Sequence, residues 1–342
     1  MWSSVCVTIV TYNSEKFIET CLRSVLAQDY DPLDVIVVDN CSLDYTPRIL
    51  ARFKDQIRVI YNDRNIGFAA AQNQAIAAGS SDWVLALNPD ASLVPDFVSR
   101  LVAAGGSDDK VGTVCGRLLS MRRDMKRTEP PLIDSTGIYF TPNVRHFDRG
   151  WHEPDDGRFR QMEYVFGASA AAALYRREMI EDISIAGEFF DSDFFVYRED
   201  ADVAWRAQLL GWRCLYVPDA VGYHVRSLIP GDRRSVSAAV NMHSVKNRFL
   251  MRIKNATGGL YRKHWIPATA RDLLVAGGCL FWEFKSLPAF WEFLKCLPRA
   301  LEARRTIMSR RRITDEEMAH WFSTKPSTQP VTQVREPVES FE

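Results

Sequence analysis

The sequence predicts an α/β fold with a mainly parallel sheet and helices on both faces. The first observation is compositional: the chain has 342 residues, of which 46% are hydrophobic and 25% charged, as in ordinary globular proteins. Secondly, residues 1–100 alternate between short aliphatic runs and stretches with helical spacing, the pattern of successive β-α-β units. Thirdly, no glycine-rich GxGxxG or GxxxxGK(S/T) loop follows the first strand, which argues against a dinucleotide oxidoreductase and a P-loop ATPase.

The first half of the chain supplies most of the expected elements. Runs rich in Val, Ile and Leu predict four buried strands, Val5–Val10, Asp34–Val38, Ile57–Tyr61 and Trp83–Leu87. Between them, apolar residues at helical spacing predict three helices, Ser14–Ala27, Asp44–Phe53 and Ala69–Ala78. Ser14 is a plausible N-cap of the first helix.

The middle of the chain is less regular. Val111–Gly116 and Arg213–Val217 are predicted strands, and Ala201–Leu210 is a predicted helix that Gly211 closes. The stretch Ser120–Arg160 is rich in proline and charge, so it is expected to be mostly loop.

The net charge is zero, but the charges are unevenly distributed. Residues 241–312 contain 15 Lys and Arg against four Asp and Glu, in a pattern that predicts basic amphipathic helices. Such a segment indicates a polyanionic partner, either phospholipid headgroups or nucleic acid, or else a helical subdomain that packs on the core. Nucleic acid is the poorer candidate, because no recognised reader motif accompanies the charge. Residues 313–342 are rich in Pro, Thr and Glu and are expected to be disordered.

The cysteines and the N-terminus indicate a reduced, cytoplasmic protein. The seven cysteines are an odd number and include no CxxC pair. The chain begins directly with a strand, without a basic region and an apolar stretch, so we expect no signal peptide. The longest apolar region of the tail, Leu273–Phe284, is shorter than the ~20 residues that a membrane span needs.

Asp90 follows a predicted strand at a position where α/β proteins bind ligands. The predicted strand Trp83–Leu87 is followed by Asn88-Pro89-Asp90, and proline stops the ladder because it has no N–H to donate. Asp90 therefore lies at the carboxyl end of a strand, where open α/β sheets bind ligands. A carboxylate there can hold a divalent cation and, through it, a diphosphate. The alternative is ordinary turn or cap chemistry.

Two further carboxylate positions share this context. Asp39 follows a buried strand and should lie on the same rim as Asp90, where it can accept hydrogen bonds from a ribose or a base. Glu199-Asp200 follows an aromatic run, and a carboxylate there could act as the general base for a sugar hydroxyl. Asp39 could instead be a turn residue, and the Glu199-Asp200 pair could cap the following helix. His224 could be a structural histidine.

The ordered set of motifs resembles the inverting glycosyltransferases of family 2, which have the GT-A fold, and in particular their rhamnosyltransferase-like branch. The resemblance covers about residues 5–226 and lies in an ordered series of motifs, namely Val7–Ser14, Val35–Ser42, Asn65–Asn73, Leu87–Asp90, Phe166–Ala168, Phe190–Asp202, Gly211-Trp212, Val217-Pro218 and His224. No single motif is sufficient, but the set and its order are highly specific. The resemblance implies a GT-A catalytic domain over residues 1–240, followed by the helical extension 241–312 and the tail 313–342.

The resemblance also implies a role for each matching residue. The residues expected to bind the nucleotide-sugar are Thr11, Tyr12, Asn13, Asp39, Asn65, Gly67, Asn73 and Asn88. Asp200 matches the catalytic base, and Glu199 its neighbour near the acceptor. Asp90 and His224 match the residues that hold the metal.

The metal motif departs from the usual Asp-x-Asp of the wider family. Asn88 replaces the first acidic residue, and a neutral amide oxygen is a weaker ligand for a hard cation. Asn-Pro-Asp is nevertheless the form usual in the rhamnosyltransferase-like branch. Binding of Mg²⁺ or Mn²⁺ is therefore expected to depend on Asp90, the diphosphate and His224.

The expected function is metal-dependent, inverting sugar transfer in the synthesis of cell-surface polysaccharide. The favoured donor is dTDP-rhamnose, and the acceptor is a glycan or a polyprenyl-linked glycan. Such an acceptor favours peripheral contact of residues 241–312 with the inner face of the plasma membrane.

Three alternatives remain open at this stage. The first is a transferase that uses a UDP- or GDP-hexose, and the second is a noncatalytic module that only binds nucleotide-sugars. The third is a sugar-nucleotide pyrophosphorylase. That class requires a glycine-rich basic loop after the first strand, and this chain has Thr11-Tyr12-Asn13 at that position.

Overall fold

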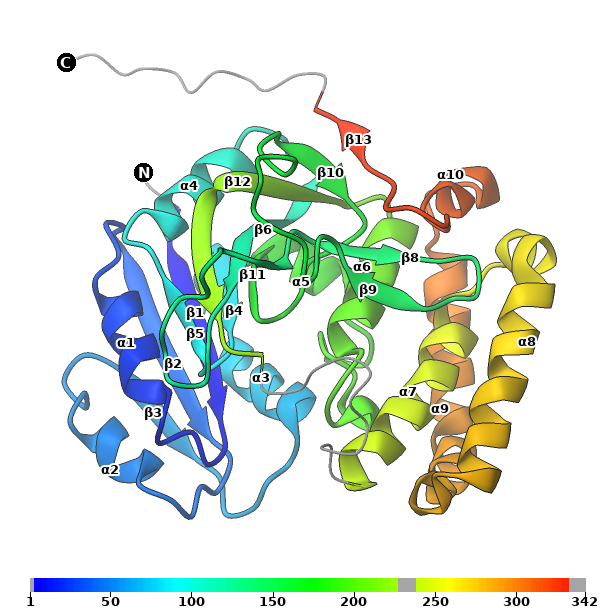
Figure 1. The fold of residues 1–342 in the computed structure, drawn as a ribbon, viewed down its shortest axis with the longest axis horizontal. Helices are drawn as coiled ribbons and strands as arrows, with labels where there is room; N and C mark the ends of the chain where they lie inside the picture. Colours follow the sequence, from blue (N-terminus) through cyan, green and yellow to red (C-terminus); the bar gives the residue numbers. More distant parts are fainter. Residues whose placement is uncertain (1–2, 227–237, 332–342) are drawn as a thin grey trace.

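The computed structural model describes residues 3–226 and 238–331, which are organised around an 11-stranded sheet. The strand order is β13-β10-β12-β6-β11-β4-β1-β2-β3, with β5 attached to β12 and β7 to β6. Figure 1 shows helices on both sides of this sheet and a block of C-terminal helices at one end of the molecule. The predicted α/β class is confirmed.

The parallel half of the sheet comes from the first hundred residues. Its strands are β1 (Val5–Thr11), β2 (Leu33–Asp39), β3 (Arg58–Tyr61) and β4 (Trp83–Leu87). They pair in parallel in the order β3-β2-β1-β4, and Thr11 lies beside Asp39 at the ends of β1 and β2. Parallel strands all end at the same edge, so β1, β2 and β4 deliver their next residues to one rim.

The other half of the sheet is mixed. Its strands are β5 (Ala91–Leu93), β6 (Val111–Ser120), β7 (Ile133–Ser135), β10 (Glu163–Val165), β11 (Ala172–Arg176), β12 (Arg213–His224) and β13 (Gln329–Pro330). β11 is antiparallel to both β4 and β6, whereas β12 is parallel to β6. A separate two-stranded sheet consists of β8 (Ile138–Phe140) and β9 (His146–Asp148).

β12 is longer than the predicted strand, which ended at Val217. It continues to His224 through a shift of register between Val217 and Val221, and Pro218 lies in that shift. A proline is tolerated at such an irregularity because no ladder hydrogen bond is lost there. The extension carries His224 to a position opposite Ala91 of β5, next to Asp90.

Helices pack on both faces of the sheet. α1 (Ile18–Leu26), α2 (Thr46–Ala51) and α4 (Phe97–Gly105) share one core cluster with β1, β2 and β4. The opposite face carries α3 (Phe68–Ala77), α5 (Arg177–Ile183) and α6 (Glu199–Leu209). The predicted helix Ser14–Ala27 begins only at Ile18, because the Ser14 carbonyl accepts from Phe17 and Ile18 in a preceding turn.

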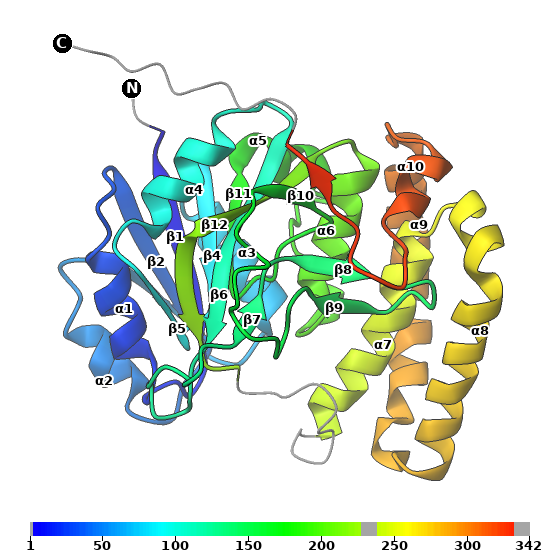
Figure 2. The same cartoon turned by 45° about the horizontal axis from the view of Figure 1, so that its top comes forward.

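The C-terminal part consists of helices that pack beside α6. They are α7 (Ala238–Asn255), α8 (Gly258–Phe281), α9 (Pro288–Ser309) and α10 (Asp315–His320), with short 3₁₀ turns η1 (Ser192–Phe194) and η2 (Phe284–Ser286). Figure 2 shows α7, α8 and α9 side by side, with α8 outermost. Within 3–226 and 238–331, no single helix has the length and apolar content to cross a membrane. Among these residues, only α8 taken together with η2 and α9 has that length and apolar content, and the two parts are bent by 114° relative to each other.

Much of the positive charge in 241–312 is used inside the protein. The Lys254 ammonium is 1% exposed and lies between the carboxylates of Asp191 and Asp202, 2.9 Å from the latter. The Arg248 guanidinium is also buried and pairs with Asp272 at 3.2 Å. These cations balance one buried and two half-buried carboxylates, so the density of positive charge in this segment reflects packing of the helices on the core as well as any external partner.

The expectation of disorder over 313–342 is wrong for residues 313–331; residues 332–342 lie outside the described chain. Thr314 and Glu317 form a reciprocal capping box that starts α10. Trp321 and Phe322 are buried in the main core cluster, and β13 pairs with β10. Met318, Trp321 and Phe322 are all buried in this cluster, and the free energy gained by burying their apolar surface orders a segment whose overall composition is polar.

We predict that Lys254→Met destabilises the protein by about 3–5 kcal/mol, because it leaves the buried Asp202 and the half-buried Asp191 with less positive charge. Urea denaturation at pH 7 measures the loss. Lys295→Met is the matched control: Lys295 pairs with Glu292 on the exposed surface, and the expected change is below about 1 kcal/mol. Equal effects of the two substitutions would contradict a structural role for the buried cation.

Candidate active site

Five predicted site residues line one pocket with a cavity volume of about 320 Å³. They are Asn88, Asp90, Glu199, Asp200 and His224. Three different elements bring them together, because the first two follow β4, the next two begin α6 and the last ends β12. The described structure thus joins both carboxylate motifs and the histidine, which are far apart in the sequence.

Backbone hydrogen bonds place Asp90 beside His224. The Asn88 N–H donates to the Ala171 carbonyl at 3.0 Å, and the Val225 N–H donates to the Asp90 carbonyl at 3.1 Å. These bonds join the end of β4 to β11 on one side and to β12 on the other. The Asn-Pro-Asp turn is therefore held from both sides, and Pro89 costs no ladder bond there.

His224 lies between two carboxylates. Its Nε2 is 3.2 Å from Asp90 Oδ1, and its Nδ1 is 2.8 Å from Asp134 Oδ2. Burial opposes a charge on the imidazole, but Asp90 and Asp134 outweigh burial and raise the pKa of His224 to about 10. Without another cation, the ring is thus protonated and bridges the two acids.

The chain of charges continues beyond Asp134. Arg226 donates from Nε to Asp134 at 2.8 Å and from Nη2 to Asp148 at 2.6 Å. Burial raises the pKa of Asp134, but His224 and Arg226 outweigh it and bring the value to about 2. The result is a continuous series of alternating charges, from Asp90 through His224, Asp134 and Arg226 to Asp148.

The chemistry of this donor set fits a divalent cation that is shared with a substrate. Asp90 offers a hard carboxylate oxygen and His224 offers Nε2, while Asp134 holds the other ring nitrogen, as a carboxylate commonly does behind a metal-bound histidine. Within 3–226 and 238–331, no group of three or more His, Cys, Asp or Glu side chains forms a cation site made by protein alone. The remaining ligands would have to come from phosphate oxygens and water, and binding would displace the proton from Nε2.

Glu199 and Asp200 occupy the first turn of α6. The turn before them is strained, since three non-glycine residues have positive φ, with Phe195 at 61°, Tyr197 at 70° and Arg198 at 72°. Such conformations persist only where the surrounding structure enforces them. Here they turn the chain sharply, so that both carboxyl groups line the pocket instead of pointing into solvent.

The two carboxyl groups have different proton affinities. Burial and the nearby Asp148 raise the pKa of Asp200 to about 6, whereas backbone N–H donors such as those of Ala170 and Ala201 partly restrain this rise. Burial and Asp200 raise the pKa of Glu199 further, to about 8, and its Oε2 has no hydrogen-bond partner among the described residues. At pH 7 Asp200 is ionised and Glu199 is protonated, so the pair combines a base with a neutral acid.

The residues predicted to contact the nucleotide form a second group at the ends of β1 and β2. Asp39 accepts from the backbone N–H of Ser42 at 3.3 Å and from its hydroxyl at 2.5 Å. Tyr12 is exposed, whereas Asn13 accepts from the Leu43 N–H at 2.8 Å. This group, with the buried Thr11, does not line the pocket of Asp90.

Asn65, Gly67 and Asn73 hold the backbone around α3. Asn65 Oδ1 accepts from the Gly67 N–H at 2.9 Å, and Gly67 has a φ of +88°. A Cβ at Gly67 would lie 2.5 Å from the Phe195 ring, so only glycine fits there. The Asn73 amide bonds the Phe190 carbonyl at 2.7 Å and its N–H at 3.0 Å. These residues therefore join α3 to the segment that leads to Asp200, and ligand contact remains a prediction for them.

Sequence reasoning missed several residues of the pocket. Asp148, Arg226 and Ser244 line it, and Asp134 lies directly behind His224. The two aspartates come from the stretch 120–160 that was expected to be loop, and each belongs to a three-residue strand. An isolated Asp within a short strand carries no local signal of function, because its partner is more than 70 residues away.

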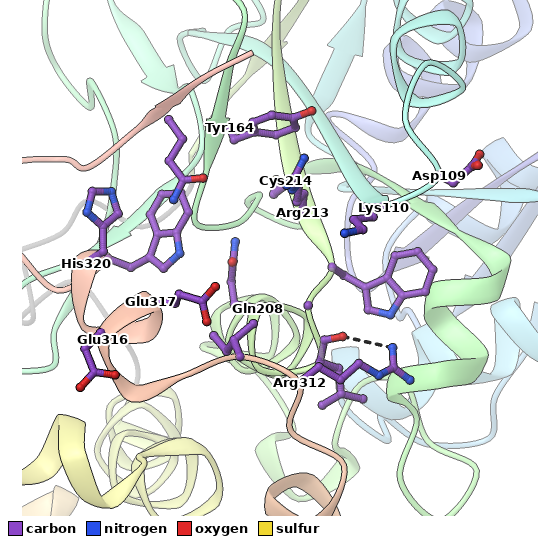
Figure 3. Close-up of a pocket in the computed structure, with 16 residues that line it drawn as sticks. Asp109, Lys110, Tyr164, Gln208, Arg213, Cys214, Arg312, Glu316, Glu317 and His320 are labelled. Carbon is purple, nitrogen blue, oxygen red and sulfur yellow. Dashed lines mark hydrogen bonds between the residues drawn. The ribbon is translucent and has the colours of Figure 1, made fainter. Parts of the chain in front are cut away.

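A larger cavity of about 720 Å³ lies elsewhere and contains none of the predicted site residues. Figure 3 shows that it lies between the end of α6, the start of β12 and α10. The Arg312 guanidinium donates to the Leu210 carbonyl at 3.1 Å and pairs with Asp182, so this cation holds the wall of the cavity together. The greater volume therefore does not mark the place where the chemistry-bearing groups converge.

These observations define an α/β protein with a strand-end pocket that combines a carboxylate–imidazole pair with the adjacent carboxyl groups of Glu199 and Asp200. The chain belongs to glycosyl transferase family 2, because the model of that family matches residues 6–184, more than half of the chain. The matched stretch contains Asp39 and Asp90 and ends before Asp200.

Curated relatives act in the synthesis of cell-surface glycans, according to their names. The chain is 36% identical over 193 residues to the succinoglycan biosynthesis protein ExoO of Rhizobium meliloti, covering 49% of this chain and 56% of that protein. It is 28% identical over 238 residues to an N-acetylglucosaminyl-diphospho-decaprenol L-rhamnosyltransferase of Mycobacterium tuberculosis, covering 64% and 75% respectively. A poly-beta-1,6-N-acetyl-D-glucosamine synthase of Staphylococcus aureus is 24% identical, and the chain spans 48% of its length.

Solved structures confirm the GT-A fold. GalNAc-T7 with UDP, GalNAc and Mn²⁺ has a TM-score of 0.59 at 14% identity, over 74% of this chain and 48% of that one. Residues 1–349 of S. aureus TarS in complex with UDP-GlcNAc have a TM-score of 0.54 at 20% identity, over 88% and 83%. At such identities the likeness concerns the fold alone.

We predict that Glu199→Gln stabilises the protein at pH 8.5 by up to about 4 kcal/mol. The folded-state pKa of Glu199 is about 8, above its ordinary value of 4.5, so folding favours the protonated acid. That contribution is complete below pH 4.5 and is lost as the pH rises to about 8. Gln mimics the protonated acid at every pH, so it avoids this loss.

Urea denaturation of both proteins at pH 5 and pH 8.5 measures the effect. At pH 5 the two free energies of unfolding should nearly agree, and the gain should appear only at the higher pH. A gain of the same size at both pH values would show that it comes from packing and not from the proton.

Proposed function

We propose that this chain is an inverting glycosyltransferase that transfers a sugar from a nucleoside diphosphate-sugar to an acceptor hydroxyl. The observation that supports this most directly is that a base with a pKa of about 6, Asp200, shares one pocket with the Asp90–His224 pair. Membership of glycosyl transferase family 2 fits the same activity. A noncatalytic binding module would have no need for a half-buried carboxylate with a raised pKa at the start of α6.

Asp200 accepts the proton of the acceptor hydroxyl in this mechanism. The acceptor oxygen forms a bond to the anomeric carbon from one face while the bond to the diphosphate oxygen breaks on the opposite face, so configuration is inverted. The electron pair of the broken bond stays on the nucleoside diphosphate. A single carboxylate base is enough, because no covalent sugar–protein intermediate forms.

Asp90 and His224 are the residues that would hold Mg²⁺ or Mn²⁺. When bound, the cation supplies positive charge to offset the charge that develops on the diphosphate. Asn88 lies 3.4 Å from His224 Nε2 and offers an amide to the same place. Protonated Glu199 beside the base keeps a second negative charge away from it and offers a hydrogen-bond donor to the acceptor.

The nucleoside is proposed to lie along the ends of β1 and β2. Thr11, Tyr12, Asn13 and Asp39 are adjacent there, with Asp39 ready to accept from a ribose or a base. Asn65, Gly67 and Asn73 support the path between this group and the Asp90 pocket. The residues that line the Asp90 pocket do not by themselves select one donor hexose over another.

The preferred donor is dTDP-rhamnose, and the preferred acceptor is a polyprenyl-linked glycan. Support comes from the likeness to a relative named as a decaprenol-linked rhamnosyltransferase, at 28% identity. UDP- or GDP-sugars are the alternative donors, because structures with this fold were solved with UDP-GlcNAc and with GDP-Man. A lipid-linked acceptor would bring the protein to the inner face of the plasma membrane.

We predict that Asp200→Asn lowers the rate of sugar transfer by about 10²–10⁴-fold, the typical contribution of a general base. Donor affinity, measured by calorimetry, should stay the same because Asp200 does not contact the diphosphate in this mechanism. Asp219→Asn, at an exposed position of β12, is the control and should keep the normal rate. Near-normal transfer by the Asp200 variant would refute its role as the base.

The donor is tested by hydrolysis of a panel of dTDP-, UDP- and GDP-sugars, with Mg²⁺, with Mn²⁺ and with a chelator. We expect dTDP-rhamnose to be turned over fastest and the chelator to abolish turnover reversibly. Preference for a UDP- or GDP-sugar would reject rhamnose and keep the class of activity. Failure to hydrolyse or transfer any of these donors would favour the binding-module alternative.

A further inference from the structure

The exposed apolar side chains of this protein are concentrated on the C-terminal helices. Sixteen large apolar residues are exposed in the described chain, and 12 of them lie between Tyr261 and Leu301. We define the apolar ridge as Leu273, Leu280, Phe281, Trp282, Phe284, Trp291 and Leu294, on the second half of α8, the η2 turn and the start of α9. Trp282 is 80% exposed and Phe281 is 70% exposed. An exposed apolar patch of this kind marks a surface that binds another protein or a membrane.

The ridge is separate from the surface by which α8 packs on the protein. Val275 and Cys279 of α8 are buried against Val245 of α7 and Ala289 of α9. Leu273 and Leu280 are two turns apart on a different stripe of the same helix, and both are exposed. α8 is thus apolar on a buried stripe and on an exposed one, and packing within the chain explains only the first.

Basic residues accompany the ridge. Residues 258–309 contain eight Lys and Arg against four Asp and Glu. Lys285 lies in the η2 turn among the aromatic residues, with Glu283 and Glu292 as the acidic residues of the same stretch, while Arg262 and Lys263 lie in the first turns of α8, ahead of the ridge. Unlike Lys254, these three cations form no ion pair with a described residue. An apolar stripe with aromatic residues and flanking cations is the composition of a helix that lies in a membrane interface.

The ridge lies close to the proposed active site. Ser244 of α7 lines the pocket of Asp200, and the next residue, Val245, packs against α8 beneath the ridge. In Figures 1 and 2, the turn between α8 and α9 lies at the same end of the molecule as the carboxyl ends of β1 and β2. A surface that receives the ridge would therefore lie beside the side of the molecule where the substrates meet.

We propose that the apolar ridge docks this protein on an anionic phospholipid bilayer, with the aromatic turn at the level of the headgroups. The purpose of this docking rests on the proposed function, since it would bring the Asp200 pocket to a lipid-linked acceptor. The two helices lie in the interface and do not cross it, since neither alone is long and apolar enough and the bend between them is 114°. The two helices that carry the ridge have eight Lys and Arg against four Asp and Glu over residues 258–309, and this excess favours an anionic lipid surface over a second copy of the same helices.

The test is flotation of the full chain with vesicles of phosphatidylglycerol and phosphatidylcholine. The wild-type protein should float with them, weakly with pure phosphatidylcholine, and less in high salt. The triple variant Phe281→Ser, Trp282→Ser, Phe284→Ser should lose at least tenfold in vesicle affinity, because three exposed aromatic side chains that would enter the bilayer are replaced by polar ones. Leu43→Ser is the matched control, since Leu43 is 86% exposed on another part of the surface; its binding should be unchanged.

Two results would overturn the proposal. One is equal flotation of the triple variant and the wild-type protein. The other is a wild-type dimer, measured by light scattering, that becomes a monomer in the triple variant while neither protein floats; the ridge would then be a contact between two copies. Circular dichroism of the triple variant confirms that it is folded.

Hydrolysis of the nucleotide-sugar in solution separates this proposal from the proposed function. The triple variant should retain the wild-type rate without vesicles, since none of its three residues lines the pocket. If the wild-type protein floats but hydrolyses no donor, the proposed function fails and the docking surface stands. If it hydrolyses a donor but does not float, the docking surface fails alone.

Discussion

The buried carboxylate of Asp202 organises the part of the protein that carries the proposed base. It is 0% exposed, and its oxygens accept from Arg206 Nε at 2.9 Å, Lys254 Nζ at 2.9 Å and Asn255 Nδ2 at 2.7 Å. Arg206 belongs to α6, whereas Lys254 and Asn255 belong to α7, so the partners of this buried charge join the two helices. Arg206 also donates to carbonyls of Ile183 and Phe189, which adds α5 and the segment before Asp200 to the same assembly.

The carboxyl groups of the pocket behave differently because their surroundings differ. Asp134 has two cationic partners and is held ionised, whereas burial and the neighbouring Asp200 outweigh Arg198 at Glu199 and hold it neutral. Asp200 lies between these cases, with two backbone donors on one side and Asp148 on the other. The same functional group is thus present in three forms around the pocket: Asp134 as an anion, Asp200 with a pKa of about 6, and Glu199 as a neutral acid at pH 7.

Local patterns were sufficient for the regular elements and for the residues that follow them. The strands before Asp39 and Asp90 are runs of buried aliphatic residues, so their carboxyl ends could be located and their shared rim inferred. The order of the motifs carried the family resemblance, including His224. By contrast, the tail 313–331 was mispredicted, because its polar composition conceals Trp321 and Phe322, which find their partners only in the folded core.

The sequence by itself therefore determined the α/β class, the parallel half of the sheet and the identity of the acidic motifs, because these depend on residue type and short-range periodicity. Only the tertiary structure decided that Asp134 and Asp148 join the site and that Asn73 binds backbone. It also decided that Lys254 is internal while Trp282 is exposed. Each of these outcomes depends on partners distant in the chain, and no local pattern encodes which distant residue will neutralise a charge or cover a ring.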